Sequence, residues 1–284
     1  MKKIFISIFI TTLLILGMTD GAYALTFEFN KDKAGVKEFV SKNLRFSSEG
    51  ENIMSKTPSS FYLITYTPDN VPVIAYKGTS SNLEKIAGGK IAKSIKGPHG
   101  EKIFYNPNQP PENKQLSSFT QWDGWVFIGN KKESLQNLLK RFKNPSDFTK
   151  TGIPTPTFKE WKEGGIRFWG NNSDEHLSNI IDAQKNTLLI PVFRNPKDIQ
   201  VIAGAFTLTP AGNMRGKIMV KPVNQQAYKN IEGDAKFISE TIRRRLAAVK
   251  SPYEGKISST DGNVVYEVFI GDYTAAQRQI VTSK

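Results

Sequence analysis

The amino-acid sequence predicts an α+β protein whose antiparallel sheets carry helices packed on one face. Three observations lead to this fold class. Strand-like segments occur in pairs joined by turn-forming residues such as Asp-Gly. A glycine, a polar capping residue and an apolar run at helical spacing often follow the second strand. The stretches VFIGN at 126–130 and VFIGD at 268–272 therefore indicate one strand-to-helix corner in two copies of a repeated ββα-like unit.

The first 24 residues are typical of a secretory signal peptide. A positive start precedes the apolar run at 4–16, and Ala-Tyr-Ala at 22–24 fits a cleavage site. The apolar run is shorter than the roughly 20 residues that a membrane span needs. We expect cleavage after Ala24, a mature chain of 284 − 24 = 260 residues without a membrane span, and a periplasmic or extracellular location in a bacterium. A retained N-terminal anchor is the alternative.

Two halves are expected in the mature chain. Residues 25–142 form an N-terminal α+β half, and residues 165–284 form a C-terminal α+β half. The segment 143–164 contains three prolines and little periodicity, so it is predicted to be a connector.

The strand pairs can be placed in order. In the first half, hairpins are predicted over 68–70 and 123–124, each followed by a glycine and a helix. In the second half, a strand leads through Gly170 and Asn171 into a helix. Hairpins over 210–213 and 261–262 follow, with a helix after each.

The charge of the mature chain indicates anionic partners. It keeps 37 Lys+Arg and 25 Asp+Glu, because the signal peptide removes Lys2, Lys3 and Asp20, and the difference is +12. Such a charge favours phospholipid head groups, envelope phosphates or acidic polysaccharides. Nucleic acid fits the charge but not the expected compartment. The chain has no cysteine, so disulfides and thiol chemistry are excluded.

The tightest cluster of positive charge is Arg243-Arg244-Arg245. It lies in a predicted helix whose apolar residues Ile238, Ile242, Leu246 and Val249 form one stripe. A docking site for an anionic partner is one interpretation. A solvated, charged helix face is the interpretation we favour.

Aromatic residues also gather in one window. All four tryptophans, Trp122, Trp125, Trp161 and Trp169, fall between 119 and 169. They could form a binding platform for sugar rings or an apolar partner. We favour a place in the core, with Trp122 opposite Trp125 across a hairpin and Trp161 as the expected exception.

No motif assigns a reaction. His99 and His176 are the only histidines, too few for a zinc site, and no nucleophile elbow or phosphate loop occurs. We therefore predict no catalytic residue, no metal and no cofactor. A glycosidase-like carboxylate pair cannot be recognised from sequence.

The strand–DGWVFIGN–helix pattern resembles exported bacterial proteins that are grouped in families of unknown function. In those families, too, a tryptophan-containing strand leads through a polar cap into a leucine-rich helix. The resemblance covers residues 60–145 best. It implies a repeated α+β envelope protein with no assigned activity.

Together these observations predict a non-enzymatic envelope protein that binds an anionic or hydrophobic partner, which could be an envelope component or an envelope protein. One alternative is a hydrolase of envelope polymers that uses unidentified carboxylates or a serine. Another is a structural or assembly subunit of a secreted or envelope complex.

Overall fold

The structure is a computed structural model that describes residues 25–37, 61–66, 72–80, 93–108, 117–129, 131–140, 143–144, 158–172, 178 and 193–273. Several predictions fall outside these ranges. They are the signal peptide, the turn at 68–70, most of the connector, and the helices expected after Gly78, Asn171 and Asp272.

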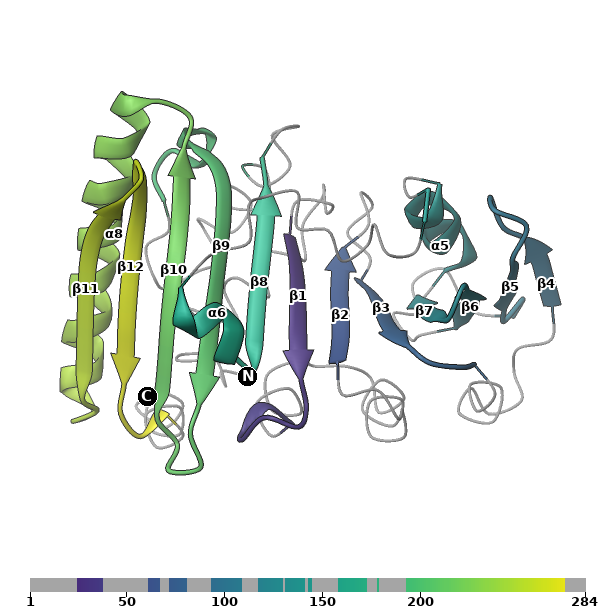
Figure 1. Ribbon diagram of the computed structural model, residues 1–284, viewed down its shortest axis with the longest axis horizontal. Helices are drawn as coiled ribbons and strands as arrows, with labels where there is room; N and C mark the ends of the chain where they lie inside the picture. Colours follow the sequence, from purple (N-terminus) through teal and green to yellow (C-terminus); the bar gives the residue numbers. More distant parts are fainter. Residues whose placement is uncertain are drawn as a thin grey trace.

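The described strands form one continuous antiparallel sheet (Figure 1). Its order is β11-β12-β10-β9-β8-β1-β2-β3-β7-β6-β5-β4. The strands are β1 (Leu25–Asn30), β2 (Phe61–Tyr66), β3 (Pro72–Lys77), β4 (Lys93–Lys96), β5 (Lys102–Tyr105), β6 (Ser118–Trp122), β7 (Trp125–Gly129), β8 (Ile166–Asn171), β9 (Ile199–Leu208), β10 (Met214–Pro222), β11 (Tyr253–Thr260) and β12 (Asn263–Ile270).

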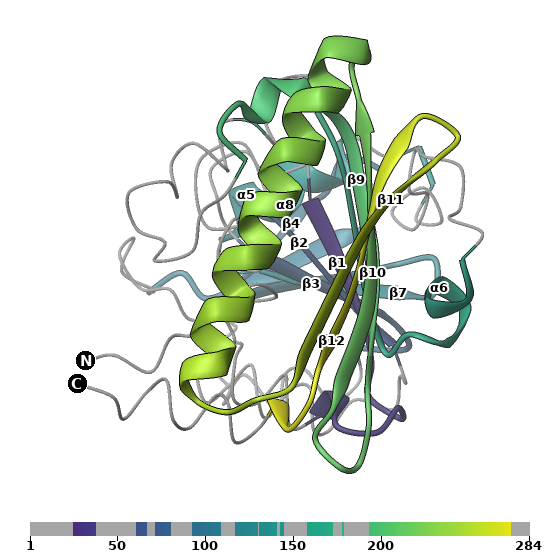
Figure 2. The same ribbon diagram turned by 90° about the vertical axis from the view of Figure 1, so that its left-hand side faces the viewer.

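Helices cover both faces of this sheet, whereas the sequence led us to expect one. The described helices are α5 (Lys132–Leu139), α6 (Lys159–Glu163), the 3₁₀ helix η3 (Pro196–Asp198) and α8 (Gln225–Ala248). Figure 2 shows α8 on one side of the sheet and α6 on the other. The reason lies in the central strands, since β9 buries side chains on both of its faces and needs cover on each. Within the described ranges, no helix is both long and apolar enough to cross a bilayer.

The two ends of the sheet have a matching strand order on either side of the central β1–β8 pair. Outward from β1 the order is β1-β2-β3-β7-β6, and outward from β8 it is β8-β9-β10-β12-β11. The hairpins β6–β7 and β11–β12 both turn through Asp-Gly with positive φ, as predicted. VFIGN and VFIGD thus end strands at matching positions. A repeated ββα unit stays a prediction.

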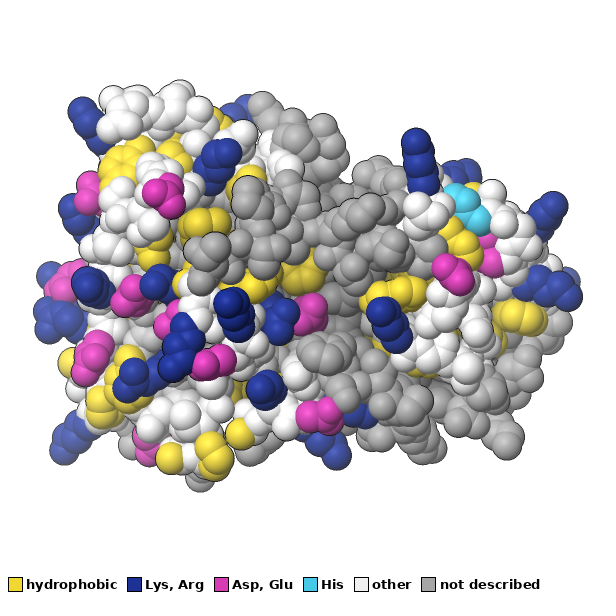
Figure 3. All heavy atoms as spheres, viewed as in Figure 1, with side chains coloured by type: hydrophobic (Ala, Val, Ile, Leu, Met, Phe, Trp, Pro, Cys, Tyr) yellow, Lys and Arg dark blue, Asp and Glu magenta, His cyan; other side chains and the backbone are white. Residues whose placement is uncertain are grey.

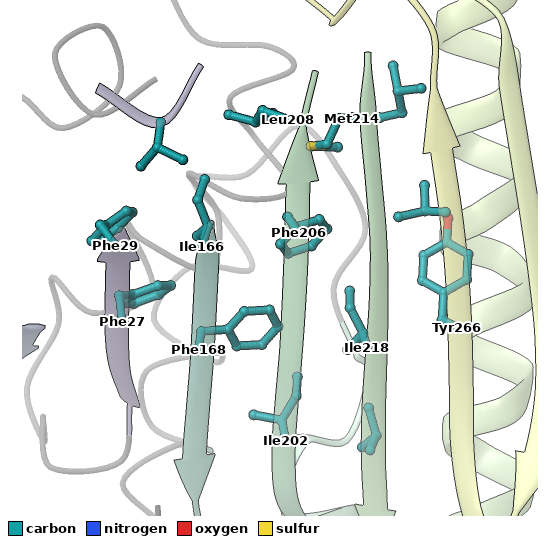
Figure 4. Close-up of a cluster of buried hydrophobic side chains, with 14 of the residues drawn as sticks. Phe27, Phe29, Ile166, Phe168, Ile202, Phe206, Leu208, Met214, Ile218 and Tyr266 are labelled. Atoms are coloured by element: carbon teal, nitrogen blue, oxygen red, sulfur yellow. The ribbon is translucent and has the colours of Figure 1, made fainter. Parts of the chain in front are cut away.

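One face of the sheet holds the larger core, against α8 (Figure 4). Phe168 lies opposite Gly204 on the neighbouring strand, and Phe206 lies opposite Gly216. A Cβ on Gly204 would stand 2.4 Å from the Phe168 ring, so each ring occupies the space that its glycine leaves open. The aromatic rings of Phe27, Phe168 and Phe206 follow one another across three strands.

The long helix α8 forms where the sequence supplies both a cap and an apolar stripe. The Asn224 side chain accepts a hydrogen bond from the Ala227 N–H (2.8 Å), which satisfies a free donor of the first turn. Ile238, Ile242 and Leu246, part of the predicted stripe, are buried against the sheet. This arrangement confirms the stripe and places the arginine triplet on this helix.

Gly204→Ala should lower the free energy of unfolding by about 1–3 kcal/mol, because the new methyl group overlaps the Phe168 ring in a packed core. Urea unfolding would measure the change. Gly233→Ala is the matched control: Gly233 lies inside α8, and its Cβ would meet only the Arg194 guanidinium at 3.8 Å. That control should gain about 0.5–1 kcal/mol from helix propensity. Equal effects of the two alanines would contradict the packing described for Gly204.

Candidate functional site

The four predicted tryptophans lie in two separate pairs. Trp122 and Trp125 are register partners across the β6–β7 hairpin, as predicted. Trp161 of α6 and Trp169 of β8 form the other pair, with ring centroids 6.1 Å apart. Trp125, Trp161 and Trp169 are at most 8 % exposed and belong to the second core cluster. Trp161, which we expected to be the exposed exception, is 5 % exposed because α6 turns it onto β9.

Trp122 is half-buried and stacks against His99. Their ring centroids are 4.2 Å apart, with planes inclined by 4°. The His99 Nε2 also hydrogen-bonds the Leu139 carbonyl at the end of α5 (2.9 Å). His99 therefore holds the β4–β5 turn against the helix.

The arginine triplet does not form a single patch. Arg243 and Arg244 both donate to the Glu240 carboxylate, each through its Nε at 2.8 Å. These hydrogen bonds lower the pKa of Glu240 to about 2. Arg245 is half-buried, and burial lowers the pKa of its guanidinium. Much of the positive charge is thus balanced within the helix, as expected of a charged helix face.

A cation and a carboxylate meet at the centre of the sheet, on the face opposite α8. Glu28 of β1 and Arg167 of β8 are register partners, and their Oε1 and Nη1 atoms are 3.3 Å apart. The two side chains are only 19 % and 24 % exposed. Burial raises the pKa of Glu28, and the charge of Arg167 acts in the opposite direction.

Aromatic and charged side chains continue from this pair across the sheet. The Arg167 guanidinium lies 6.0 Å from the Trp161 ring centroid, and the Phe158 ring meets Trp161 edge-on at 6.0 Å. The Lys217 ammonium lies 5.8 Å from the Phe158 ring centroid and 2.8 Å from a Glu267 carboxylate oxygen. We call this set the cation–aromatic band, and its members are Glu28, Arg167, Trp161, Phe158, Lys217 and Glu267.

Exposed charges surround the band on the same face of the sheet. Arg215, Lys221 and Lys256 are exposed cations and Glu254 is an exposed carboxylate. We call these four residues the open face. Figure 3 views this side, where Lys and Arg side chains are interspersed with fewer acidic ones. In the band and open face together, cations outnumber carboxylates by five to three, so the surface favours anions.

The Glu28–Arg167 pair was not predicted from the sequence, for a physical reason. The two residues lie in strands far apart in sequence, and the sequence does not show which strands pair. A signal was nevertheless present. Each strand carries one charge, of opposite sign, at a position that alternates with buried phenylalanines or isoleucine.

Several carboxylates of the described residues are engaged with cations. Among the described residues, no group of three His, Asp or Glu side chains could hold a metal ion. The carboxylates of Glu28, Asp234, Glu240 and Glu267 are each paired with a cation. Cations held by aromatic and acidic neighbours are instead ready to meet an anionic group with little loss of side-chain freedom.

Glu28→Gln should change how stability depends on pH. The folded-state pKa of Glu28 lies above the ordinary value of about 4.5 for a glutamate, so its stabilising contribution is present below that pH and is lost as pH rises through the folded pKa. Relative to the wild type, the variant should therefore gain unfolding free energy between about pH 4 and pH 7. Urea unfolding at both pH values would measure this gain.

Glu240→Gln is the control of opposite sign, because the pKa of Glu240 is lowered by its arginine partners. That variant should lose stability relative to the wild type as pH rises from about 2 to about 4.5, and by little, since the carboxylate is exposed. A pH-independent difference for Glu28→Gln would contradict a raised pKa at this site.

Comparisons with known proteins supply no relative for this site. No family model matches the chain, and no curated protein or solved structure matches it. The resemblance to exported proteins of unknown function therefore stays a prediction.

Proposed function

We propose that this protein is an exported, non-enzymatic protein of the cell envelope that binds an anionic envelope component. The ligand would lie across the cation–aromatic band and the open face. The observation that carries the proposal is the arrangement of Arg167 and Lys217, which carboxylate and aromatic neighbours hold on a sheet surface that is rich in further cations.

The proposal favours an anionic partner over a hydrophobic one. Trp161 and Trp169 are nearly fully buried, so they support the surface from below and offer little area for an apolar ligand. Lys221 and Lys256, by contrast, are exposed and have no ion pair with the described carboxylates. Their charge is available to a partner.

The spacing of these cations suits a polymer with repeated charges. Arg215 and Lys217 occupy successive same-face positions on β10, which places their Cα atoms about 7 Å apart. Lys256 lies two strands away, across β12, so cations repeat in both directions of the sheet. An envelope polymer with phosphate or carboxylate groups matches this pattern, as does an anionic lipid surface.

We also infer that the two halves of the chain are copies of one unit. Their matching strand order and the two Asp-Gly hairpins support this inference. On this view β1 and β8 are corresponding strands, and the Glu28–Arg167 pair lies at the junction of the copies.

Co-sedimentation with purified envelope fractions tests the proposed function. The mature chain should pellet at low salt and be released at high salt, because salt screens exposed charges. The double variant Arg215→Gln, Lys221→Gln should bind about tenfold or more weakly, since each cation near an anionic surface contributes about 1 kcal/mol.

The double variant Arg243→Gln, Arg244→Gln is the matched control, because it removes the same charge from α8 on the other side of the sheet. It should bind like the wild type. Loss of binding in this variant alone would move the docking site to the arginine triplet. Pelleting at both salt concentrations would indicate a protein partner or an apolar contact, and no pelleting would overturn the proposal.

A further inference from the structure

The edge of the sheet at β11 presents backbone groups that no described strand pairs. The Gly271 N–H donates to the Pro252 carbonyl (2.8 Å), and Thr260 pairs with Asn263 next to the turn. In an antiparallel pair, hydrogen-bonded residues alternate with residues whose N–H and C=O point away. The backbone groups of β11 that point outward therefore belong to its odd-numbered residues, Tyr253, Gly255, Ile257 and Ser259. Within the described part of the chain β11 is the last strand of the sheet, and Figure 2 looks onto this edge.

The opposite edge of the sheet is protected in a way that β11 is not. The edge strand β4 has only four residues, and two of them are lysines. Short length and lysines are common protections of sheet edges against pairing with another strand. The strand β11 has eight residues and contains no proline, so it can pair along its whole length. The sheet is therefore open to a further strand at β11 and protected at β4.

The charges of β11 are self-complementary about Gly255. Glu254 and Lys256 flank this glycine and are both exposed on the open face. If a second β11 runs antiparallel with its Gly255 opposite Gly255 of the first, Glu254 of each copy faces Lys256 of the other. Both cross-strand pairs then join opposite charges, which stabilises neighbouring strands. The order Glu-Gly-Lys therefore allows this strand to pair with itself.

The neighbouring symmetric registers of β11 lack this match. A pairing centred on Glu254 or on Lys256 puts like charges directly opposite each other, which destabilises a sheet. A pairing centred on Ile257 puts Lys256 opposite Ser258, so the charges stay unmatched. Gly255 is also an outward-pointing residue, so at the centre it exchanges backbone hydrogen bonds with Gly255 of the second copy. Charge and backbone geometry thus select the same centre.

Apolar side chains match on the other face of the same register. Tyr253 and Ile257 are partly buried and pack against the main core, and the Tyr253 hydroxyl hydrogen-bonds Ser239 of α8 (2.8 Å). In a pairing centred on Gly255, Tyr253 of each copy faces Ile257 of the other. An aromatic residue opposite a β-branched one is a stabilising cross-strand pair. The helix α8 contacts β10 and β12 as well as β11, so it is not confined to the edge strand.

A second copy of this chain matches the β11 edge without any further assumption about its sequence. It supplies the complementary charges and the apolar partners from β11 itself, whereas a foreign strand would have to carry them independently. The pairing also closes, because each copy uses its one open edge and the β4 edges are protected. Closed two-fold dimers are the commonest oligomers of soluble proteins. Self-complementarity and closure therefore favour the second copy as the occupant.

We propose that two copies of this chain dimerise by antiparallel pairing of their β11 strands, centred on Gly255. The two-fold axis is perpendicular to the sheet, so both open faces lie on the same side of one continuous sheet. Glu254 and Lys256 belong to the open face, and the dimer pairs them with each other across the axis. Arg215 and Lys221 remain as exposed cations of that face. Dimerisation does not depend on the ligand of the open face, so each proposal can fail without the other.

Sedimentation velocity of the mature chain over a range of concentrations tests the proposal. The wild type should form a dimer. Glu254→Lys and Lys256→Glu should each weaken this dimer about tenfold or more, because two pairs of opposite charge become two pairs of like charge. An equimolar mixture of the two single variants should restore dimerisation, since each variant meets opposite charges on the other. The double variant Glu254→Lys, Lys256→Glu should dimerise like the wild type.

Two controls separate this interface from other effects of charge. The variant Lys159→Glu, Glu163→Lys exchanges an exposed ion pair on α6 at constant net charge, and it should remain dimeric. The variant Arg215→Gln, Lys221→Gln should also remain dimeric although it binds envelope fractions weakly. A loss of envelope binding with an intact dimer would therefore bear on the open face alone.

Amide hydrogen exchange gives a second readout. At a concentration at which the wild type is dimeric, exchange at Tyr253, Gly255 and Ile257 should be slower than in Lys256→Glu. A wild type that stays monomeric overturns the proposal and leaves the edge to a segment of another protein. A dimer that neither single variant weakens, or that their mixture fails to restore, overturns it as well, because the interface then lies elsewhere.

Discussion

The pairing of β1 with β8 is the constraint on which the rest of the structure depends. It is the one ladder in the described sheet that joins strands of the first half to strands of the second. On one face it aligns Phe27 with Phe168 in the main core, and on the other it brings Glu28 to Arg167. The register of β1 against β8 therefore sets both the core contacts and the candidate site, and a shift of this pairing by one residue would destroy both.

Burial of both faces of the central strands explains where the charged side chains of the candidate site lie. Side chains from β9 and β8 fill the space under α6, so Trp161 and Trp169 are buried by packing there. Charged groups remain on β12 and β11, beyond α6, and on β10, which α6 contacts less than it contacts β9. The cation–aromatic band marks the boundary between these two regions. Its cations rest on aromatic rings, which limits their motion and keeps them at the surface.

Local features of this fold were predictable, and long-range ones were not. The turns at 123–124 and 261–262, the Trp122–Trp125 pair and the apolar stripe of α8 follow from short-range chemistry. The Glu28–Arg167 pair depends on which strands become neighbours. Packing of the whole core decides which strands become neighbours, and no local periodicity in the sequence reveals that pairing. The same reasoning explains Trp161, whose burial is fixed by a contact with β9.

The central position of β1 has a consequence for the order of folding. This strand lies between β2 and β8, so one of its edges stays unpaired until residues 166–171 have been synthesised and have found it. Closing so long a loop is slow compared with forming a hairpin. For a chain that is exported, as proposed, such a delay keeps the polypeptide open during translocation. The last strands of the sheet would then pair after translocation, in the compartment in which the protein acts.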